Sequence, residues 1–138
     1  RYSKLADFTS GQPEFASIDV SFISLRLILP PLAQILKMGG EVVALIKPQF
    51  EAGKEHVGKN GIIHDHKVHR AVLEEVLTFA REDHFDILGL DYSPIKGGQG
   101  NMEFLVHLRL SENPGIVAEE VNIDKVIAAA DDDLNHKE

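Results

Sequence analysis

The sequence contains no cysteine, and no apolar run in it approaches the roughly 20 residues that a membrane-spanning helix needs. The absence of cysteine excludes a disulfide scaffold, a zinc or iron–sulfur site with cysteine ligands, and a thiol nucleophile. The first residues show no signal-peptide pattern. The 138 residues suffice to bury a hydrophobic core without covalent cross-links. We therefore expect a soluble, cytoplasmic globular domain that does not act on a membrane.

Basic residues are also few, since 14 Lys and Arg stand against 22 Asp and Glu, and the formal net charge is −8. A negative charge argues against a nucleic-acid partner. The acids, however, are concentrated: residues 111–138 hold eight acids and two bases, whereas residues 1–110 hold 14 acids and 12 bases. We predict that residues 111–138 form an acidic C-terminal tail, with a short, solvated and separable helix that begins at Asn122. Bulk acidity therefore does not exclude an RNA substrate for residues 1–110.

Hydrophobic patterning predicts an α/β fold. Strands are expected at 15–20, 42–46, 86–92 and 103–110, and helices at 22–37 and 66–82. Helices separate the first three strands, which should therefore be parallel, whereas a short turn joins the last two and makes the fourth strand antiparallel, at or near the sheet edge. Pro30 and Pro31 should kink or split the first helix, and residues 49–65 should form a long polar loop.

Three ionisable residues are predicted to meet at one rim of this sheet. Asp19 and Lys47 follow the first two strands, and Glu103 begins the antiparallel fourth strand. In open α/β sheets, ligands bind beyond the carboxyl ends of the parallel strands. The topology thus predicts a site at Asp19, Lys47 and Glu103; the alternative is that they are solvated charges at strand ends.

The polar loop contains a near match to the phosphate-binding pattern G-x-x-x-x-G-K-[ST], at Gly53, Gly58 and Lys59. Asn60 stands where the pattern needs a hydroxyl for magnesium, and Gly61 follows where a helix should already run. We favour a flexible basic lid over the rim, carrying Lys54 and Lys59.

Histidines at 64, 66 and 69 have the composition of a metal cluster. The apolar stripe of the helix passes close to His69, and Asp65 is well placed to cap the helix N-terminus. Capping and packing are therefore the favoured roles of this segment, and no metal site is predicted. His107 alternates onto the face opposite Phe104 and should be a packed or solvated strand residue.

The rim residues lie in motifs that resemble a known family. Segments 19–25 (DVSFISL), 44–53 (ALIKPQFEAG) and 100–104 (GNMEF) are similar to the TlyA (hemolysin A) family of FtsJ-like ribosomal RNA ribose 2′-O-methyltransferases, and segment 57–65 resembles its lid loop. The resemblance covers about residues 1–110 and implies a Rossmann-like methyltransferase fold. It also implies S-adenosylmethionine as cofactor and ribosomal RNA or a ribosomal subunit as partner.

The resemblance further implies roles for the three rim residues. FtsJ-like enzymes use a Lys-Asp-Lys-Glu tetrad, whose Asp, second Lys and Glu correspond to Asp19, Lys47 and Glu103, with Asp19 beside the cofactor. The glycine-rich cofactor turn, the first lysine of the tetrad and the small RNA-binding module of the family have no counterpart in the sequence. We therefore expect residues 1–110 to be the C-terminal part of a methyltransferase domain, and methyltransferase activity to belong to the intact protein.

The chemistry of the rim predicts how Lys47 would act. Acidic neighbours favour the charged ammonium form of a lysine, so Lys47 should stabilise a developing alkoxide rather than accept its proton. Lys54, Lys59 and Lys96 surround the same rim and are predicted to bind RNA. Two alternatives stay open: a non-enzymatic α/β binding domain, and a membrane-active hemolysin. The second would need a membrane-active stretch, and packing on the sheet explains helix 66–82 better.

Overall fold

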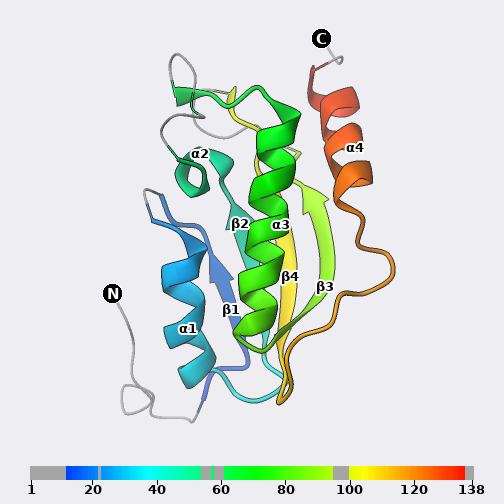
Figure 1. Ribbon diagram of the computed structural model, residues 1–138. Coiled ribbons are helices and arrows are strands. Elements are labelled where there is room, and N and C mark those ends of the chain that lie inside the picture. Colours follow the sequence, from blue (N-terminus) through cyan, green and yellow to red (C-terminus); the bar gives the residue numbers. More distant parts are fainter. Residues whose placement is uncertain (1–11, 22, 54–56, 58–60, 95–99, 136–138) are drawn as a thin grey trace.

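The computed structural model of the chain describes residues 12–21, 23–53, 57, 61–94 and 100–135. The elements in chain order are β1 (Phe15–Ile18), α1 (Leu25–Ile35), β2 (Glu41–Ile46), α2 (Pro48–Glu51), α3 (His66–Glu82), β3 (Phe85–Tyr92), β4 (Phe104–Leu110) and α4 (Ile123–Asn135) (Figure 1). All four predicted strands and both predicted helices are present. The expected α/β class is therefore confirmed.

The strands form one sheet in the order β1-β2-β4-β3. β1 and β2 are parallel, with Ile18 opposite Ala44, and β4 is antiparallel to both of its neighbours. β3 therefore runs parallel to β1 and β2, as predicted, and β4 lies one place in from the edge. Because Ile46 pairs with Phe104, the end of β2 and the start of β4 lie at the same rim, next to the end of β1.

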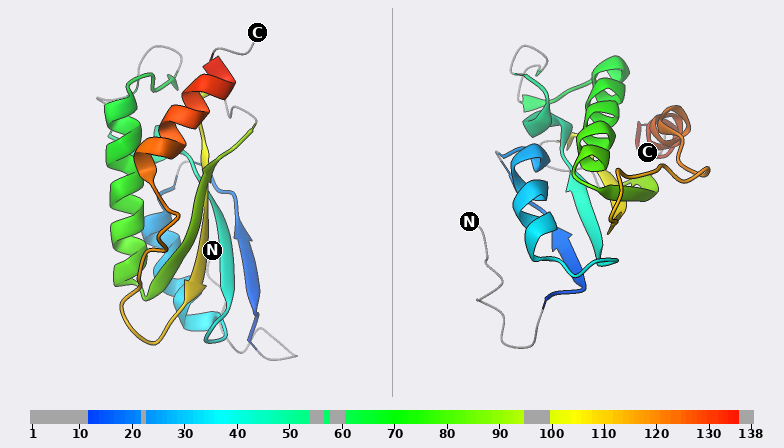
Figure 2. Two further views of the ribbon diagram at one scale, coloured as in Figure 1. Left: turned by 90° about the vertical axis from the view of Figure 1, so that its right-hand side faces the viewer. Right: turned by 60° about the horizontal axis from the view of Figure 1, so that its bottom comes forward.

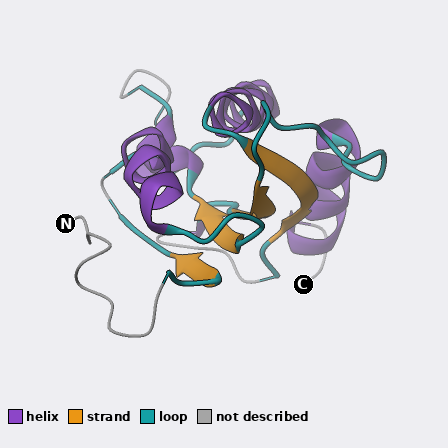
Figure 3. Cartoon of the chain, turned by 90° about the horizontal axis from the view of Figure 1, so that it is seen from below, coloured by secondary structure: helices purple, strands orange, loops and turns teal. Residues whose placement is uncertain are grey.

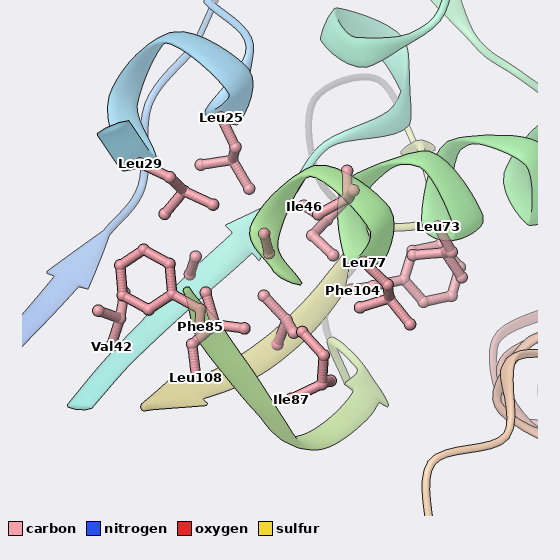
Figure 4. Close-up of a cluster of buried hydrophobic side chains, with 14 of the residues drawn as sticks. Leu25, Leu29, Val42, Ile46, Leu73, Leu77, Phe85, Ile87, Phe104 and Leu108 are labelled. Carbon is pink, nitrogen blue, oxygen red and sulfur yellow. The ribbon is translucent and has the colours of Figure 1, made fainter. Parts of the chain in front are cut away.

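The core lies between the sheet and the helices α1 and α3, which cover the same face (Figures 2 and 3). Alternate residues of β2 and β4 point toward these helices and are fully buried: Val42, Ala44 and Ile46, and Phe104, Val106 and Leu108. Leu25 and Leu29 of α1 and Leu73 of α3 meet them from the helix side (Figure 4). The strict alternation along β4 is the pattern that the sequence predicted.

Helix α1 is not split as the sequence allowed, because Pro30 and Pro31 lie inside one helix that runs from Leu25 to Ile35. Each proline removes one backbone donor but adopts a φ angle that a helix accepts. Burial of Leu25 and Leu29 against the sheet, together with the cap at Ser24, holds the helix together. Residue 22, where the predicted helix began, lies outside the described residues.

Helix α3 spans His66–Glu82, the range that the apolar spacing predicted. The carboxylate of Asp65 accepts a hydrogen bond from the amide of Lys67 at 2.8 Å, which confirms the predicted N-cap. The segment before it was wrongly expected to be loop throughout, since Pro48–Glu51 form the single helical turn α2. Proline suits the first position of a helix, because its missing N–H would have no intrahelical partner there.

The acidic C-terminal segment is not a solvated appendage. Its predicted helix is present as α4, and Asn122 caps it by accepting from the amide of Lys125 at 3.0 Å. Ile127 and Ala130 of α4 are buried in the main core, against α3 and β3. The expectation of a separable helix is therefore wrong, because the sequence pattern showed an apolar stripe without showing that α3 and β3 offer it a surface. The boundary at residue 110 stays a prediction.

The chain returns to the sheet before it reaches α4. Residues 116–118 run beside β3, where the Ile87 amide donates to the Ile116 carbonyl at 2.8 Å and the Ala118 amide donates to the Ile87 carbonyl at 2.9 Å. Gly115 passes so close to β3 that a Cβ atom there would lie 1.7 Å from the Phe85 carbonyl oxygen. This close approach fixes where the C-terminal segment crosses the end of the sheet.

Candidate active site

Asp19 and Lys47 meet at the carboxyl ends of β1 and β2, as their positions in the sequence predicted. The Nζ atom of Lys47 lies 2.5 Å from Oδ1 of Asp19 and 3.3 Å from Oγ of Ser21. The Lys47 side chain is 14% exposed and that of Asp19 is 67% exposed. A mostly buried ammonium needs such acceptors, because burial without them disfavours its charged form. The pair thus holds a cation at the rim with one carboxylate open to solvent.

Glu103 lies at the same rim, just before β4, but is buried, with 5% of its surface exposed. Its Oε2 atom accepts a hydrogen bond from Nε2 of Gln49 at 2.9 Å. The register that pairs Ile46 with Phe104 places Lys47 and Glu103 at adjoining strand ends. The three predicted site residues therefore share one rim: Asp19 is in direct contact with Lys47, and Glu103 is joined to the same chain segment through Gln49.

Glu51, at the end of α2, reaches the first turn of α1. Its Oε1 atom accepts from the Ser24 hydroxyl at 2.6 Å, and its Oε2 atom accepts from the Leu25 amide at 2.9 Å. A carboxylate at a helix N-terminus satisfies an otherwise unpaired N–H and is favoured by the helix dipole. Glu51 therefore holds the N-terminus of α1 against α2.

Gln49 and Glu51 received no role from the sequence, although both belong to the KPQFEAG motif. The available signal was their spacing: Lys47, Gln49 and Glu51 are alternate residues of one short segment. Because a helical turn rotates about 100° per residue, side chains two apart in α2 point to opposite sides. The structure shows the result, with Lys47 joined to Asp19, Gln49 to Glu103, and Glu51 to Ser24.

Asn101 anchors the segment that leads into α3. Its Oδ1 atom accepts from the Ile63 amide at 2.9 Å, and its Nδ2 atom donates to the Gly61 carbonyl at 2.8 Å. Asn101 is buried, and Met102 and Glu103 directly after it are buried as well. The start of β4 thus holds both the acid of the site and the chain that enters α3. Lys54, Lys59 and Lys96, the predicted RNA-binding residues, lie outside the described residues.

The histidines at the start of α3 form a contact in which His69 is buried and His66 is partly exposed. Nδ1 of His69 lies 3.0 Å from Nδ1 of His66, and Nε2 of His66 lies 3.1 Å from Oδ1 of Asp131 in α4. Burial and the neighbouring His66 lower the pKa of His69 to about 4, so its ring is neutral at neutral pH. The described ranges contain no group of three or more residues able to hold a metal ion. His107 pairs with Glu41 across the sheet.

A family model described as "FtsJ-like methyltransferase" matches residues 2–110. The chain belongs to the FtsJ-like methyltransferase family. The matched range includes the whole sheet and all three rim residues, so membership agrees with the Rossmann-like fold and with the resemblance of the motifs. The match ends at the last residue of β4, and α4 lies beyond it.

Curated relatives carry related names. The chain is 58% identical over 108 residues to a Bacillus subtilis protein named "Putative rRNA methyltransferase YqxC". It is 34% identical over 108 residues to the Mycobacterium tuberculosis "16S/23S rRNA (cytidine-2'-O)-methyltransferase TlyA", and 38% identical over 100 residues to "Hemolysin A" of Brachyspira hyodysenteriae. These matches cover 78%, 78% and 72% of the chain, and 38%, 40% and 42% of the relatives. The chain thus matches less than half the length of each relative.

Two solved structures share the fold. A "Putative hemolysin from Streptococcus thermophilus" superposes with a TM-score of 0.92 at 52% sequence identity, over 99% of this chain and 50% of the other. A "putative hemolysin from Lactococcus lactis" superposes with a TM-score of 0.87 at 59% identity, over 92% of this chain and 60% of the other. The first superposition covers nearly the whole chain, so the fold it shares extends beyond residue 110.

Proposed function

We propose that the protein containing this chain is an S-adenosylmethionine-dependent ribose 2′-O-methyltransferase of ribosomal RNA. The observation that carries the proposal is the ion pair of Lys47 and Asp19 beside the buried Glu103, at the ligand-binding rim of an FtsJ-like domain. Methyl transfer to a ribose hydroxyl needs an oxygen held in line with the methyl group, and stabilisation of the negative charge that develops on that oxygen. A lysine fixed by the Asp19 carboxylate at this rim can do both.

Each rim residue has a distinct part in the proposed reaction. Lys47 faces the target hydroxyl and, as an ammonium, stabilises the developing alkoxide. Asp19 orients Lys47, because its carboxylate oxygen is the nearest acceptor to Nζ. Glu103 holds the network from the buried side and contacts the substrate ribose. Positioning supplies much of the acceleration in such a reaction.

S-adenosylmethionine, when bound, supplies the methyl group as a sulfonium. Among the described rim residues, Asp19 suits this cationic cofactor best, since its carboxylate is 67% exposed and already beside Lys47. The 138 residues contain no G-x-G-x-x-G pattern between a strand and a helix. The cofactor contact that we assign to this chain is therefore limited to Asp19.

The RNA partner would be held by positive charge around the rim. Lys54, Lys59 and Lys96 remain our assignment for this contact, because they flank the rim residues in sequence. Three of the four acids of α4 already have partners within the fold: Asp124 pairs with Arg70, Asp131 lies beside His66, and Asp133 accepts from the Tyr92 hydroxyl. A ribosomal substrate would place the activity in the cytoplasm.

The test is methyl transfer from labelled S-adenosylmethionine to ribosomal subunits, measured with the complete gene product that contains this sequence. We expect Lys47→Ala to lower transfer by at least a hundredfold while the protein stays folded. Lys37→Ala, at an exposed lysine near the opposite end of the sheet, is the matched control and should retain wild-type transfer. Wild-type transfer by folded Lys47→Ala protein would overturn the assignment.

Two other functions would give different results. A non-enzymatic binding domain predicts that the complete gene product does not bind S-adenosylmethionine in a calorimetric titration. A membrane-active hemolysin, the activity in the names of three relatives, predicts leakage of dye from liposomes. None of the helices in the described part of the chain is long and apolar enough to cross a membrane. We therefore expect cofactor binding and no leakage.

A further inference from the structure

Only one of the two polar side-chain atoms of Gln49 has a hydrogen-bond partner in the described part of the chain. Its Nε2 atom donates to Oε2 of Glu103 at 2.9 Å. Its Oε1 atom is buried and has no hydrogen-bond partner among the residues that the structure describes. The polar end of Gln49 therefore has a single partner in the described chain, the carboxylate of Glu103.

The burial of Glu103 makes this contact important. A carboxylate that is only 5% exposed has lost most of its water, and it needs hydrogen-bond donors to stay charged at low cost. A hydrogen bond to a charged group contributes more than one between neutral groups, and its loss leaves the buried charge uncompensated. Gln49 is the side chain that supplies such a donor.

The backbone around Gln49 is well placed to keep the amide in position. Pro48 starts α2 and is buried, and the Phe50 amide closes the turn on the Lys47 carbonyl at 2.9 Å. Glu51 ties the end of the same turn to α1. Gln49 therefore sits on a turn fixed at both ends, directly after the lysine of the site.

The Oε1 atom, which has no donor among the described residues, argues against a purely structural role. A buried acceptor without a donor carries a cost in free energy, and its presence calls for an explanation. An apolar side chain of similar volume would fill the same space without that cost. A glutamine at this position thus suggests a need for the donor that faces Glu103.

We propose that Gln49 is a positioning residue of the methyl-transfer site, which acts by holding the carboxylate of Glu103 in place beside Lys47. The proposal rests on the proposed methyltransferase function and adds a residue to its site. It predicts that loss of the amide lowers the rate of the chemical step much more than it weakens binding of the RNA substrate, because Gln49 does not itself contact the RNA and reaches the substrate only through Glu103.

The experiment compares Gln49→Met with wild type in the complete gene product, using labelled S-adenosylmethionine and ribosomal subunits. Met keeps the volume of Gln and removes the donor. We expect kcat to fall roughly ten- to hundredfold, as loss of a charged hydrogen bond implies, with KM for the subunits within about twofold. Gln34→Met, at an exposed position of α1, is the matched control and should not change either constant.

A double-mutant cycle separates positioning from general structural support. If Gln49 acts through Glu103, Gln49→Met should cost little further activity in a Glu103→Gln background, where the charge it serves is already removed. Unfolding in urea, measured on the same four proteins, reports whether the two side chains are coupled in stability. If Gln49→Met does not fold, Gln49→Asn withdraws the amide from Glu103 by one methylene and serves in its place.

The outcomes distinguish this inference from the function on which it rests. Two results would overturn the positioning role without affecting the proposed methyl transfer by wild type. One is a wild-type kcat in folded Gln49→Met protein. The other is an equal loss of activity on Gln49→Met in the wild-type and Glu103→Gln backgrounds. A rise in KM for the ribosomal subunits without a change in kcat would also overturn the positioning role. No methyl transfer by wild-type protein that binds the cofactor would instead overturn the proposed function.

Discussion

The ammonium of Lys47 lies 2.5 Å from the carboxylate of Asp19, and the two partners differ in exposure, at 14% and 67% of their side chains. The pair joins the ends of two parallel strands, β1 and β2. Its cation is largely buried, and its anion is largely open to solvent. A ligand that enters the rim therefore meets Asp19 first, with Lys47 held behind it.

Asp19→Asn should separate activity from stability. The exposed carboxylate contributes about 1 kcal/mol or less to folding, as is typical of an ion pair with a solvated partner. The same change removes the negative charge that orients Lys47, so we expect methyl transfer to fall at least tenfold. Urea unfolding and methyl transfer on the same protein check both. Asp132→Asn, at an exposed position of α4, should leave transfer unchanged, and a stability loss that matches the activity loss would contradict the prediction.

Glu51→Gln should destabilise the fold by about 1–2 kcal/mol, because Glu51 supplies the charged acceptor at the N-terminus of α1. Chemical unfolding measures the change. Glu74→Gln, at an exposed position of α3, changes the same functional group and should have an effect near zero. Equal stability of the two variants would show that the contact of Glu51 with Ser24 and Leu25 does not contribute to folding.

His69 should make stability depend on pH. Its pKa in the folded protein, about 4, lies below the ordinary value of 6.5, so the unfolded chain binds this proton more readily. The contribution of neutral His69 to the free energy of unfolding is therefore fully present above pH 6.5. It is lost as the pH falls toward 4, and the loss amounts to about 3 kcal/mol at most. Urea unfolding of wild type and His69→Phe across this range isolates the effect, since Phe104 already packs against the ring.

The matched control for this prediction is His64→Gln, because His64 is exposed and lies just before the same helix. The stability profile of His64→Gln should stay close to that of wild type, because His64 is the weakest of the neighbours that shift the pKa of His69. The profile of His69→Phe should be flatter than both between pH 4 and 6.5. Parallel profiles for wild type and His69→Phe would mean that the folded and unfolded chains bind the His69 proton equally well.

Gly115→Ala should destabilise the protein by several kcal/mol, because its Cβ atom would lie 1.7 Å from the backbone oxygen of Phe85 and the chain would have to move. Gly89→Ala is the matched control, since its Cβ atom would meet only the Cβ atom of His107, at an ordinary 3.8 Å. Thermal unfolding compares the two. If Gly115→Ala is as stable as Gly89→Ala, the C-terminal segment does not need its close passage over β3.

The sequence could predict only those site residues that lie at the ends of predicted strands. Asp19 and Lys47 each follow an apolar strand, and the parallel order of those strands follows from the helix between them. Glu103 could be placed because a short turn forces β4 to run back from the same rim. Gln49 and Glu51 could not be assigned, because their roles depend on partners 54 and 26 or 27 residues away in the chain.

The sequence by itself determined the four strands, the helices α1, α3 and α4, the α/β class and the position of the three rim residues, because apolar periodicity and strand order are local or topological properties. Only the tertiary structure decided the rest. It buried Ile127 and Ala130 of α4 in the core, since a stripe on a helix does not show which surface will cover it. It kept α1 whole through two prolines, because packing outweighed two missing hydrogen bonds. It also joined Gln49 to Glu103, because a donor and a buried acid find each other only when the chain has folded.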